Sequence, residues 1–363
     1  MRHWLALSAA LLGAAACSTA PSANEPAALP AKLVLAHRGA SAVRPEHTIA
    51  AYTRAIEDGA DVIEPDLVST KDGVLVVRHE NEISGTTDVA DKPEFAARRT
   101  TKKIDNADVT GWFTEDFTLA ELQTLRAKER IPENRPANMQ FNGQFPIPTF
   151  QSVIDLAKRM SRETGRPIGI YPETKHPSYF KSIGLPLEKS LVDTLHANGY
   201  RGKSAPVFIQ SFEVANLKEI RQLTDLPIVQ LLGPGQPEDF RLAGDKRSYA
   251  DMITPAGLRE IATYANGIGP TKNMVIPRTA QALPGKPTAL VTNAHALKLL
   301  VHPYTFRPEN PFLPANLRNG DAKSGRGDAA AEIILFLEAG VDGVFTDDSA
   351  VGRAAMDAFL HRK

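Results

Sequence analysis

Three acidic residues in this sequence lie at the ends of short apolar runs. Glu64 and Asp66 are two residues apart in "DVIEPDL", and Glu173 ends the run "IGIYPE". Side chains two apart on a strand point to the same face, so Glu64 and Asp66 should be close neighbours. Two adjacent carboxylates repel unless a cation lies between them. Carboxylates without a thiol ligand suit a hard cation, so we expect a Ca²⁺ site on Glu64, Asp66 and Glu173, with Mg²⁺ less favoured.

Two histidines occur at similar positions, each beside a basic residue. His37 and Arg38 follow the run "LVLA", and His79 ends "VLVVRH". Histidine can gain or lose a proton near neutral pH, which suits a general acid and a general base. Arg38, as a planar fork of donors, and Lys175, as a point charge, suit a bound phosphate group. With no nucleophile elbow, P-loop or dinucleotide fingerprint in the chain, these residues favour metal-assisted cleavage of a phosphodiester.

These residues must be positioned by strands that alternate with amphipathic helices. The strand candidates are residues 33–37, 61–67, 74–79, 168–173, 207–212, 228–232, 267–270, 300–305 and 343–347. Alternation of apolar strands and helices predicts a parallel sheet covered by helices. We therefore expect an α/β fold of the (β/α)8 TIM-barrel type, in which the strand ends meet at one face. That face would also receive Gln210, Phe212, Tyr304 and Asp347.

One of the nine strand candidates is not part of the barrel. Only "VSTKDG" separates residues 61–67 from 74–79, and a parallel crossover needs about a dozen residues. The pair Asp72-Gly73 is a hairpin signal, so residues 74–79 should return antiparallel. With Asp72-Gly73 or Lys71-Asp72 as the loop, His79 lies opposite Asp66 or Glu64.

Two polar segments between the second and third barrel strands fit no repeat of strand and helix. Residues 84–117 and 126–148 are rich in Lys, Arg, Asp and Asn, and we expect a small insertion at about 84–148 beside the functional face. We expect residues 233–257 to form a second segment of this kind.

The composition bounds the remaining possibilities. The 363 residues carry 42 Lys+Arg and 42 Asp+Glu, so the formal net charge is zero and nothing favours a nucleic acid partner. The sequence predicts one barrel domain over residues 32–363, because barrels of roughly 250 residues or more commonly form one domain. Its partners should be small molecules, and the oligomeric state is left open.

The N-terminus resembles a secretory signal. Residues 1–17 combine an early Arg with an apolar stretch and small residues before Cys17, the only cysteine of the chain. Cys17 stands where a bacterial lipoprotein would be cut and lipidated, although an ordinary cut after Ala16 or Ala20 is the alternative. Residues 18–31 then form a Pro/Ala/Ser tether. We expect a secreted protein of the periplasm or cell envelope that meets the membrane only through this anchor.

Several motifs together resemble the bacterial periplasmic glycerophosphodiester phosphodiesterases. They are "AHRGAS", "PEHT", "EPDLVSTKDGVLVVRHE", "DVAD", "IGIYPETK", "VHPYTFR" and "GVFTDD", spread over about residues 33–360. The resemblance implies a TIM barrel, Ca²⁺ on the three carboxylates, and His37 and His79 as the acid-base pair. It also implies that Arg38 and Lys175 hold the phosphate, that Gln210, Phe212 and Tyr304 line the substrate site, and that the products are glycerol 3-phosphate and an alcohol.

The sequence departs from the family pattern at four places. Glu80 follows His79 where Asp is usual, Pro65 separates two of the acids, and Asp347 precedes Asp-Ser rather than a proline-containing turn. His47 replaces a common Asn, and we interpret it as structural, beside Thr48 as the helix cap.

Two other functions stay open at the level of sequence. One is a related barrel phospholipase acting on choline phospholipids, which would need an exposed apolar rim, whereas "FAARRTTKKIDNAD" is polar. The other is a non-catalytic surface lipoprotein that binds ligands, against which the intact histidines and acids argue.

Overall fold

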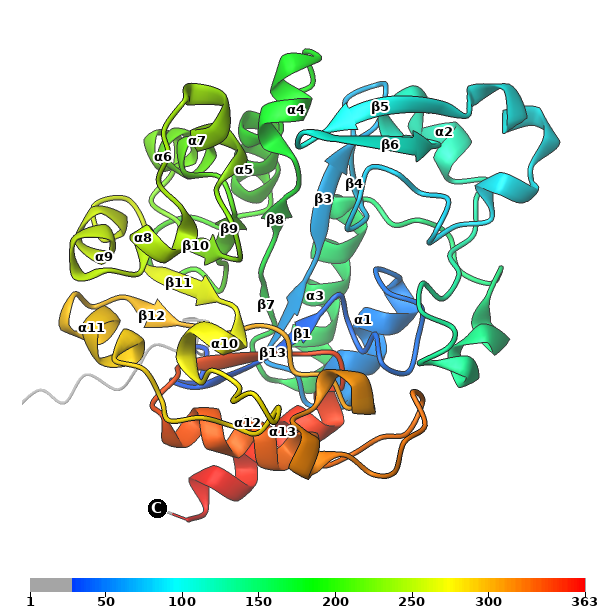
Figure 1. The fold of residues 1–363 in the computed structure, drawn as a ribbon. Coiled ribbons are helices and arrows are strands. Elements are labelled where there is room, and N and C mark those ends of the chain that lie inside the picture. The colour runs from blue at the N-terminus through cyan, green and yellow to red at the C-terminus, as the bar shows by residue number, and fades with distance from the viewer. Residues whose placement is uncertain (1–27, 363) are drawn as a thin grey trace, which may run out of the picture.

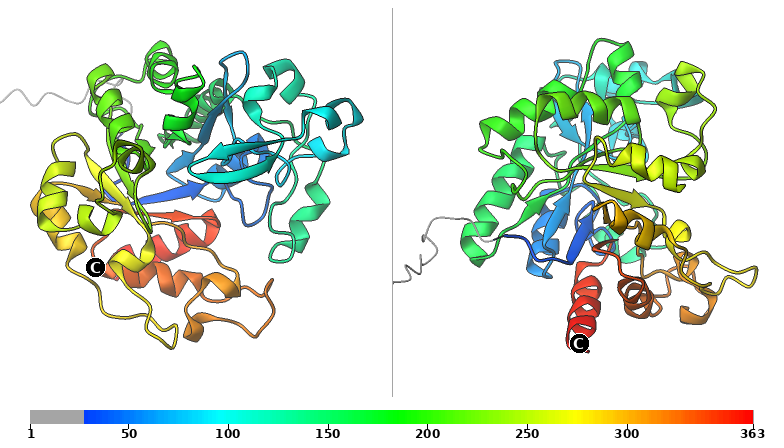
Figure 2. Two further views of the ribbon diagram at one scale, coloured as in Figure 1. Left: turned by 45° about the horizontal axis from the view of Figure 1, so that its top comes forward. Right: turned by 90° about the vertical axis from the view of Figure 1, so that its left-hand side faces the viewer.

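The computed structural model describes residues 28–362. The predicted signal segment 1–17, Cys17 and most of the tether 18–31 lie outside the described residues. Parallel strands form a ring with helices around its outside (Figures 1 and 2). The barrel strands are β1 (Leu33–His37), β2 (Val62–Glu64) with β3 (Asp66–Ser69), β7 (Gly169–Ile170) with β8 (Glu173–Thr174), β9 (Ile209–Ser211), β10 (Ile228–Leu232), β11 (Gly267–Pro270), β12 (Leu300–Val301) and β13 (Gly343–Thr346).

The pairing of these strands runs around a closed ring of eight positions within residues 28–362. In the first part of the ring β13 pairs with β1, β1 with β2, and β2 with β7. In the second part β3, which continues β2, pairs with β8, and the order goes on through β9, β10, β11 and β12. Two positions are split in two pieces, one of them at Pro65, whose missing N–H interrupts the hydrogen-bond ladder. The ring closes where Phe306 pairs with Thr346 in parallel, with Phe306 N donating to Phe345 O at 2.8 Å. The predicted TIM-type barrel is therefore present.

Side-chain alternation along the strands explains how the barrel builds both its interior and its functional face. Leu33, Leu35, Val62, Tyr171, Val229 and Phe345 form one buried cluster. Continuing each strand in steps of two leads to His37, Glu64, Asp66, Glu173 and Asp347. Successive inward positions of a strand share one face, so the apolar filling of the barrel and the polar residues at its carboxyl end come from one alternating pattern.

The hairpin that follows β3 is present, but with a different register from the predicted one. β4 (Leu75–Val77) pairs antiparallel with β3, and Leu67 lies opposite Val77. Thr70 N donates to Val74 O at 3.0 Å, so the loop has three residues, 71–73, and Gly73 takes a φ of +77°. In this register Arg78 N donates to Asp66 O, and His79 lies beyond the end of β4 rather than opposite Asp66 or Glu64. The two-residue loop was wrong because a turn ending in Gly also fits a three-residue hairpin.

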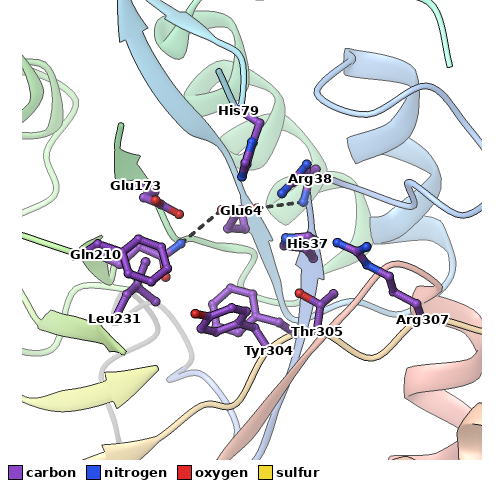
Figure 3. Close-up of a pocket in the computed structure, with 12 residues that line it drawn as sticks. His37, Arg38, Glu64, His79, Glu173, Gln210, Leu231, Tyr304, Thr305 and Arg307 are labelled. Carbon is purple, nitrogen blue, oxygen red and sulfur yellow. Dashed lines mark hydrogen bonds between the residues drawn. The ribbon is translucent and has the colours of Figure 1, made fainter. Parts of the chain in front are cut away.

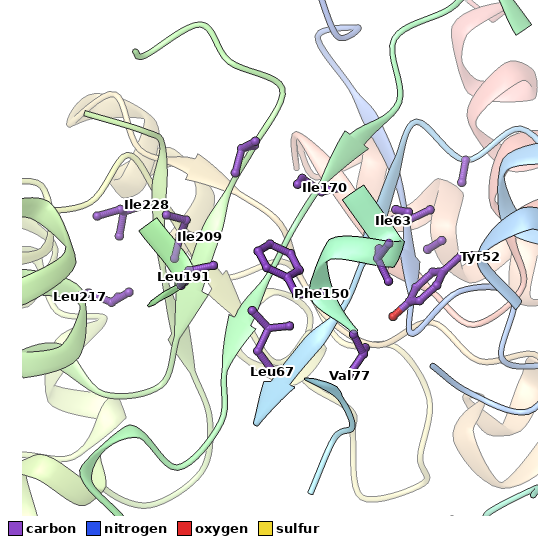
Figure 4. Packing of buried hydrophobic residues seen from close by; sticks show 14 of the residues in the cluster. Tyr52, Ile63, Leu67, Val77, Phe150, Ile170, Leu191, Ile209, Leu217 and Ile228 are labelled. Carbon is purple, nitrogen blue, oxygen red and sulfur yellow. The ribbon is translucent and has the colours of Figure 1, made fainter. Parts of the chain in front are cut away.

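The outer layer consists of helices that bury apolar faces against the strands. A large core cluster joins helix residues such as Tyr52, Phe150 and Leu217 to strand residues such as Ile63 and Ile209 (Figure 4). Side-chain caps begin some of the helices, for example Thr48 before α1 and Thr149 before α3. The helices are α1 (Ile49–Glu57), α2 (Leu119–Leu122), α3 (Phe150–Thr164), α4 (Pro177–Ser182), α5 (Glu188–Ala197), α6 (Val214–Leu223), α7 (Glu238–Ala243), α8 (Tyr249–Met252), α9 (Pro255–Ile261), α10 (Lys272–Val275), α11 (Leu290–Ala296), α12 (Ala329–Glu338) and α13 (Ser349–Leu360). No helix in this described part is long and apolar enough to span a bilayer.

The segment between β4 and α3 lies beside the carboxyl ends of the strands (Figure 1). It contains the hairpin β5 (Thr100–Ile104) and β6 (Ala107–Gly111), the short helix α2, and several 3-10 turns. The hairpin turns at Asp105-Asn106, where both residues have positive φ, as a tight type I′ turn requires. Arg135 anchors the far part of this segment through an ion pair with Glu309, 2.7 Å between Nε and Oε1.

Candidate active site

A cavity of about 120 Å³ opens at the carboxyl ends of the barrel strands. Figure 3 shows side chains from several strands converging around Glu64. Eight of the predicted site residues line the cavity: His37, Arg38, Glu64, His79, Glu173, Gln210, Phe212 and Tyr304. The two others lie next to it, with Asp66 beside Glu64 and Glu173 and Lys175 bonded to Glu173. The structure thus brings together all ten residues, although their catalytic roles stay predictions.

The His-Arg-Gly sequence forms a sharp turn at the end of β1. Arg38 has a φ of +61° and Gly39 a φ of +85°. A Cβ on residue 39 would lie 2.7 Å from the Ala51 carbonyl carbon, so only glycine fits this close approach of α1. The turn aims the Arg38 backbone N–H at Glu64 Oε2, 2.8 Å away. This backbone contact fixes one side of the carboxylate group.

Glu64, Asp66 and Glu173 form a buried group of three carboxylates. Each offers one oxygen, and these oxygens all lie within 4.8 Å of one another. Asp66 Oδ1 and Gln210 Oε1 are buried without a hydrogen-bond partner in the described structure. Buried acceptors without donors are costly, and a divalent cation coordinated by oxygens would satisfy them. The donor set therefore fits a hard cation such as Ca²⁺ or Mg²⁺, because it consists of oxygens alone.

The electrostatics of these carboxylates also favour a cation beside them. Burial and the neighbouring Asp66 and Glu173 carboxylates raise the pKa of Glu64 well above its usual value. Burial likewise raises the pKa of Glu173 to about 8, although the Lys175 ammonium opposes this. Burial opposes ionisation of Asp66 too, but Lys175 and His47 hold its pKa well below the usual range. The group thus cannot carry its full negative charge comfortably without an added cation.

His37 is oriented by Asp347 across the junction of the first and last strands. His37 Nδ1 lies 2.6 Å from Asp347 Oδ1. Two arginines hold the other carboxylate oxygen, Arg135 from the insertion and Arg307, the latter at 3.1 Å. Burial and the Arg38 charge lower the pKa of His37 to about 4, against the opposing effect of Asp347. At neutral pH His37 is therefore neutral, with its proton on Nδ1 and a lone pair on Nε2.

His79 also lies beside a carboxylate, but its Nδ1 has no hydrogen bond within the described residues. Its Nδ1 lies 2.7 Å from Glu80 Oε1, and its Nε2 lies 3.4 Å from Lys175 Nζ. Glu80 also contacts His176, which in turn lies 2.5 Å from Asp105 at the tip of the β5–β6 hairpin. Burial, Arg38 and Lys175 lower the pKa of His79 to about 3. Against burial, the two carboxylates raise the pKa of His176 to about 9.

The two predicted phosphate-binding cations are already held by acids. Arg38 Nη1 lies 3.2 Å from both oxygens of Glu46, and its Nε lies 3.6 Å from Asp66 Oδ2. Lys175 Nζ donates to Glu173 Oε1 at 2.8 Å. These ion pairs hold both cationic side chains in place beside the cavity. Arg38 Nε has no hydrogen bond within the described structure, so it keeps donor capacity for an anion.

Several functional neighbours were not identified in the sequence. Arg307 and Thr305 line the cavity, and Glu46 and Arg135 support it from outside. Arg307 lies three residues after Tyr304 in "VHPYTFR", which is the one local signal that could have indicated it. Arg135 gives no such signal, because it approaches from the insertion.

His47 does more than begin the first helix. Thr48 caps α1, as predicted, by accepting from Ala51 N at 3.0 Å. His47 is fully buried, and its Nε2 lies 2.8 Å from Asp66 Oδ2 while its Nδ1 lies 2.7 Å from the Tyr52 hydroxyl. It therefore orients one carboxylate of the candidate metal site, a role that partners of ligands commonly have.

A barrel with histidines, carboxylates and cations at its carboxyl end is typical of an enzyme that acts on phosphate esters. Residues 37–351 match the sequence profile of the glycerophosphoryl diester phosphodiesterase family. The chain belongs to this family. It is 40% identical over 328 residues to glycerophosphodiester phosphodiesterase GDPD6 of Arabidopsis thaliana, covering 86% of this chain and 82% of the relative. A Haemophilus influenzae glycerophosphodiester phosphodiesterase is 31% identical, with 87% of each chain covered.

Solved structures show the same fold. A phosphodiesterase of Oleispira antarctica, in complex with the product sn-glycerol-3-phosphate, superimposes with a TM-score of 0.57 at 18% identity and covers 91% of this chain and 97% of its own. A glycerophosphodiester phosphodiesterase from Agrobacterium tumefaciens gives a TM-score of 0.54 at 17% identity, with 89% and 99% covered. These comparisons confirm three predictions: the family, the barrel fold and the phosphodiesterase class of enzyme.

Proposed function

We propose that this enzyme hydrolyses glycerophosphodiesters, such as glycerophosphocholine and glycerophosphoethanolamine, to glycerol 3-phosphate and an alcohol. The observation that carries the proposal is the meeting of two histidines with three buried carboxylates at one cavity. The names of the family and of its relatives support the same substrate class. The product bound to the Oleispira antarctica phosphodiesterase is the product expected here.

The substrate can supply its own nucleophile. In the cavity lining within residues 28–362, Tyr304 and Thr305 carry the hydroxyl groups, and neither is hydrogen-bonded to a histidine. The glycerol 2-hydroxyl is already held beside the phosphorus, and such intramolecular attack has a high effective molarity. A cyclic glycerol phosphate would form first, and water would then open it.

The two histidines would move the protons of this reaction. Each has Nδ1 beside a carboxylate, Asp347 for His37 and Glu80 for His79. For His37 this contact is a hydrogen bond, which fixes the ring and leaves Nε2 as the atom that exchanges a proton. His79 would use its Nε2 as well, which lies 3.4 Å from Lys175 Nζ. One histidine would take the proton of the 2-hydroxyl, and the other would protonate the departing alcohol oxygen. Arg38 and Lys175 would hold the phosphate oxygens as charge develops on them.

The carboxylate group Glu64, Asp66 and Glu173 would hold Ca²⁺, with Mg²⁺ as the less favoured alternative. When bound, the cation supplies positive charge to the phosphate oxygens. The enzyme treated with chelator should lose activity, and added Ca²⁺ should restore it. Full activity after exhaustive chelation would contradict this part of the proposal.

An analogue of glycerophosphocholine with hydrogen in place of the 2-hydroxyl tests the function and its mechanism together. Glycerophosphocholine itself should be hydrolysed to glycerol 3-phosphate. The analogue should bind with similar affinity yet turn over at a negligible rate. Cleavage of the analogue at the normal rate would mean that water attacks phosphorus directly.

We also propose export and lipidation at Cys17, on the basis of the apolar N-terminus and the Pro/Ala/Ser tether. Mass spectrometry of the mature N-terminus measures this. A diacylated Cys17 is expected, and a free N-terminus at a later residue would exclude it.

A further inference from the structure

A second cavity, of about 300 Å³, adjoins the catalytic one and shares Glu173, Phe212 and Tyr304 with it. Its other walls come from the start of α4, the hairpin tip at Asp105, and residues 233–249. Small-molecule pockets typically measure about 300–1,000 Å³, which exceeds the catalytic cavity. A diester whose phosphate lies in the catalytic cavity must therefore extend one substituent beyond it.

Aromatic rings form one corner of this second cavity. The Phe212 ring lies 6.0 Å from the Tyr249 ring at 77° and 6.0 Å from the Tyr304 ring at 88°. Gly233 lies against them, where a Cβ would come within 3.3 Å of the Phe212 ring and 3.5 Å of the Tyr304 hydroxyl. Rings set at right angles present faces and edges to the same space, and ring faces attract cations, especially quaternary ammonium groups.

Most of the charges around the second cavity are paired with one another. Lys175 is bound to Glu173, with 2.8 Å between Nζ and Oε1. His176 lies 2.5 Å from Asp105. Glu238, at the start of α7, pairs with Arg241 on the same helix at 2.5 Å. Of the four acids that line the cavity, Glu213 is the one that these ion pairs do not include.

Glu213 is a buried carboxylate without a cation. It is 4% exposed and accepts hydrogen bonds from the Ser178 hydroxyl and from Ser178 N at 3.3 Å. No ion pair reaches it from any residue of the described chain. Burial, with the nearby Asp239 and Asp105 carboxylates, raises its pKa to about 7. A positive group in the cavity would favour the ionised form and supply the missing partner.

A third cavity shares Tyr304 with the other two and contains no acidic residue in its lining among residues 28–362. It measures about 350 Å³ and is lined by Lys272, Arg278 and Arg307. These cations are paired with acids behind the lining, Lys272 and Arg278 with Glu332 and Arg307 with Asp347. The third cavity therefore offers a cationic substituent no carboxylate, whereas the second cavity offers Glu213.

We propose that the second cavity receives the alcohol half of the diester and selects an alcohol that carries a positively charged ammonium group. The inference rests on the proposed function and adds the headgroup preference to it. Glu213 supplies the negative charge, and Phe212, Tyr249 and Tyr304 supply the ring surfaces. Choline fits both features, and ethanolamine fits chiefly the carboxylate.

Competing diesters with the same glycerol phosphate half test this preference. With the full chain in Ca²⁺, kcat/KM is measured for glycerophosphocholine and for the neutral glycerophosphoglycerol. The ratio of the two values should be at least about tenfold in the unmodified enzyme. It should fall towards one in Glu213→Gln, because Gln keeps the acceptor for Ser178 but loses the charge. Glu238→Gln is the matched control, since Arg241 already neutralises that carboxylate, and the ratio should stay within twofold.

Phe212→Leu provides a second variant that does not depend on Glu213, and its ratio should also fall. A ratio near one in the unmodified enzyme would overturn the inference, as would an equal loss for both diesters in Glu213→Gln. If neither diester is hydrolysed, the proposed function fails instead. Calorimetric titration with choline chloride then decides the cavity separately: binding weakened at least about tenfold by Glu213→Gln supports it, and no binding refutes it.

Discussion

Replacing Asp347 with Asn tests whether the contact across the first and last strands controls His37. Asp347 Oδ1 lies 2.6 Å from His37 Nδ1, while its other oxygen is held by Arg135 and Arg307. The substitution keeps the size of the side chain and removes its charge. Asn can present its amide nitrogen to Nδ1, which would shift the imidazole proton to Nε2, the atom that must exchange it.

The size of the effect follows from the loss of one contact. A hydrogen bond to a charged group contributes about 1.5–3 kcal/mol. The lower pKa of His37 in the variant expresses the same loss and is not added to it. The value of kcat should therefore fall by about 10–10². KM should change little, because Asp347 does not line the cavity.

Initial rates with glycerophosphocholine at saturating substrate measure this fall, and thermal melting checks that the variant folds. Asp348→Asn is the matched control: Asp348 is the next residue, caps α13 through Val351 N at 3.0 Å and pairs with Arg326, without contact to His37. Its kcat should stay within threefold. If Asp347→Asn retains a kcat within threefold, or if the control loses as much, Asp347 has no special role in catalysis.

Three other outcomes are expected. Glu64→Gln should weaken Ca²⁺ binding, measured by calorimetry, while its circular dichroism stays native, and unchanged affinity would place the cation elsewhere. His37→Ala and His79→Ala should each lower kcat by about two to four orders of magnitude, and a normal kcat in either would make that histidine structural. The raised pKa of His176, about 9 against 6.5, means that its ion pairs stabilise the fold fully below pH 6.5 and are lost as pH rises through 9. The free energy of unfolding, measured by thermal melting, should therefore fall by about 1–2 kcal/mol between pH 6.5 and 9, a discounted figure because the two carboxylates are partly exposed. Asp105→Asn should make this pH dependence weaker. An unaltered pH profile in that variant would refute the reasoning.

The sequence predicted the barrel and the position of several candidate site residues at its carboxyl end, because strand alternation is a short-range rule. Alternation in steps of two leads from Leu33 and Leu35 to His37, and from Val62 to Glu64. This pattern can be recognised within the sequence of one strand. The register of the β3–β4 hairpin was wrong by one residue, because Asp72-Gly73 fits loops of two or three residues. The partners of Asp347 and of Asp66 could not be predicted, since Arg135 and His47 approach from loops whose paths depend on tertiary packing. Burial and neighbouring charges set the pKa of His79 near 3, and neither is visible in a sequence motif.

The closure of the barrel has a consequence for the order in which the enzyme becomes competent. His37 and Asp347 are 310 positions apart, so the orienting carboxylate is synthesised long after the histidine that it holds. Glu64, Asp66 and Glu173 all precede the middle of the chain, whereas the carboxylate that orients His37 arrives with β13, which pairs with β1. The His37–Asp347 contact can therefore form only after the last strand has docked. A chain that ends before β13 would lack this contact altogether.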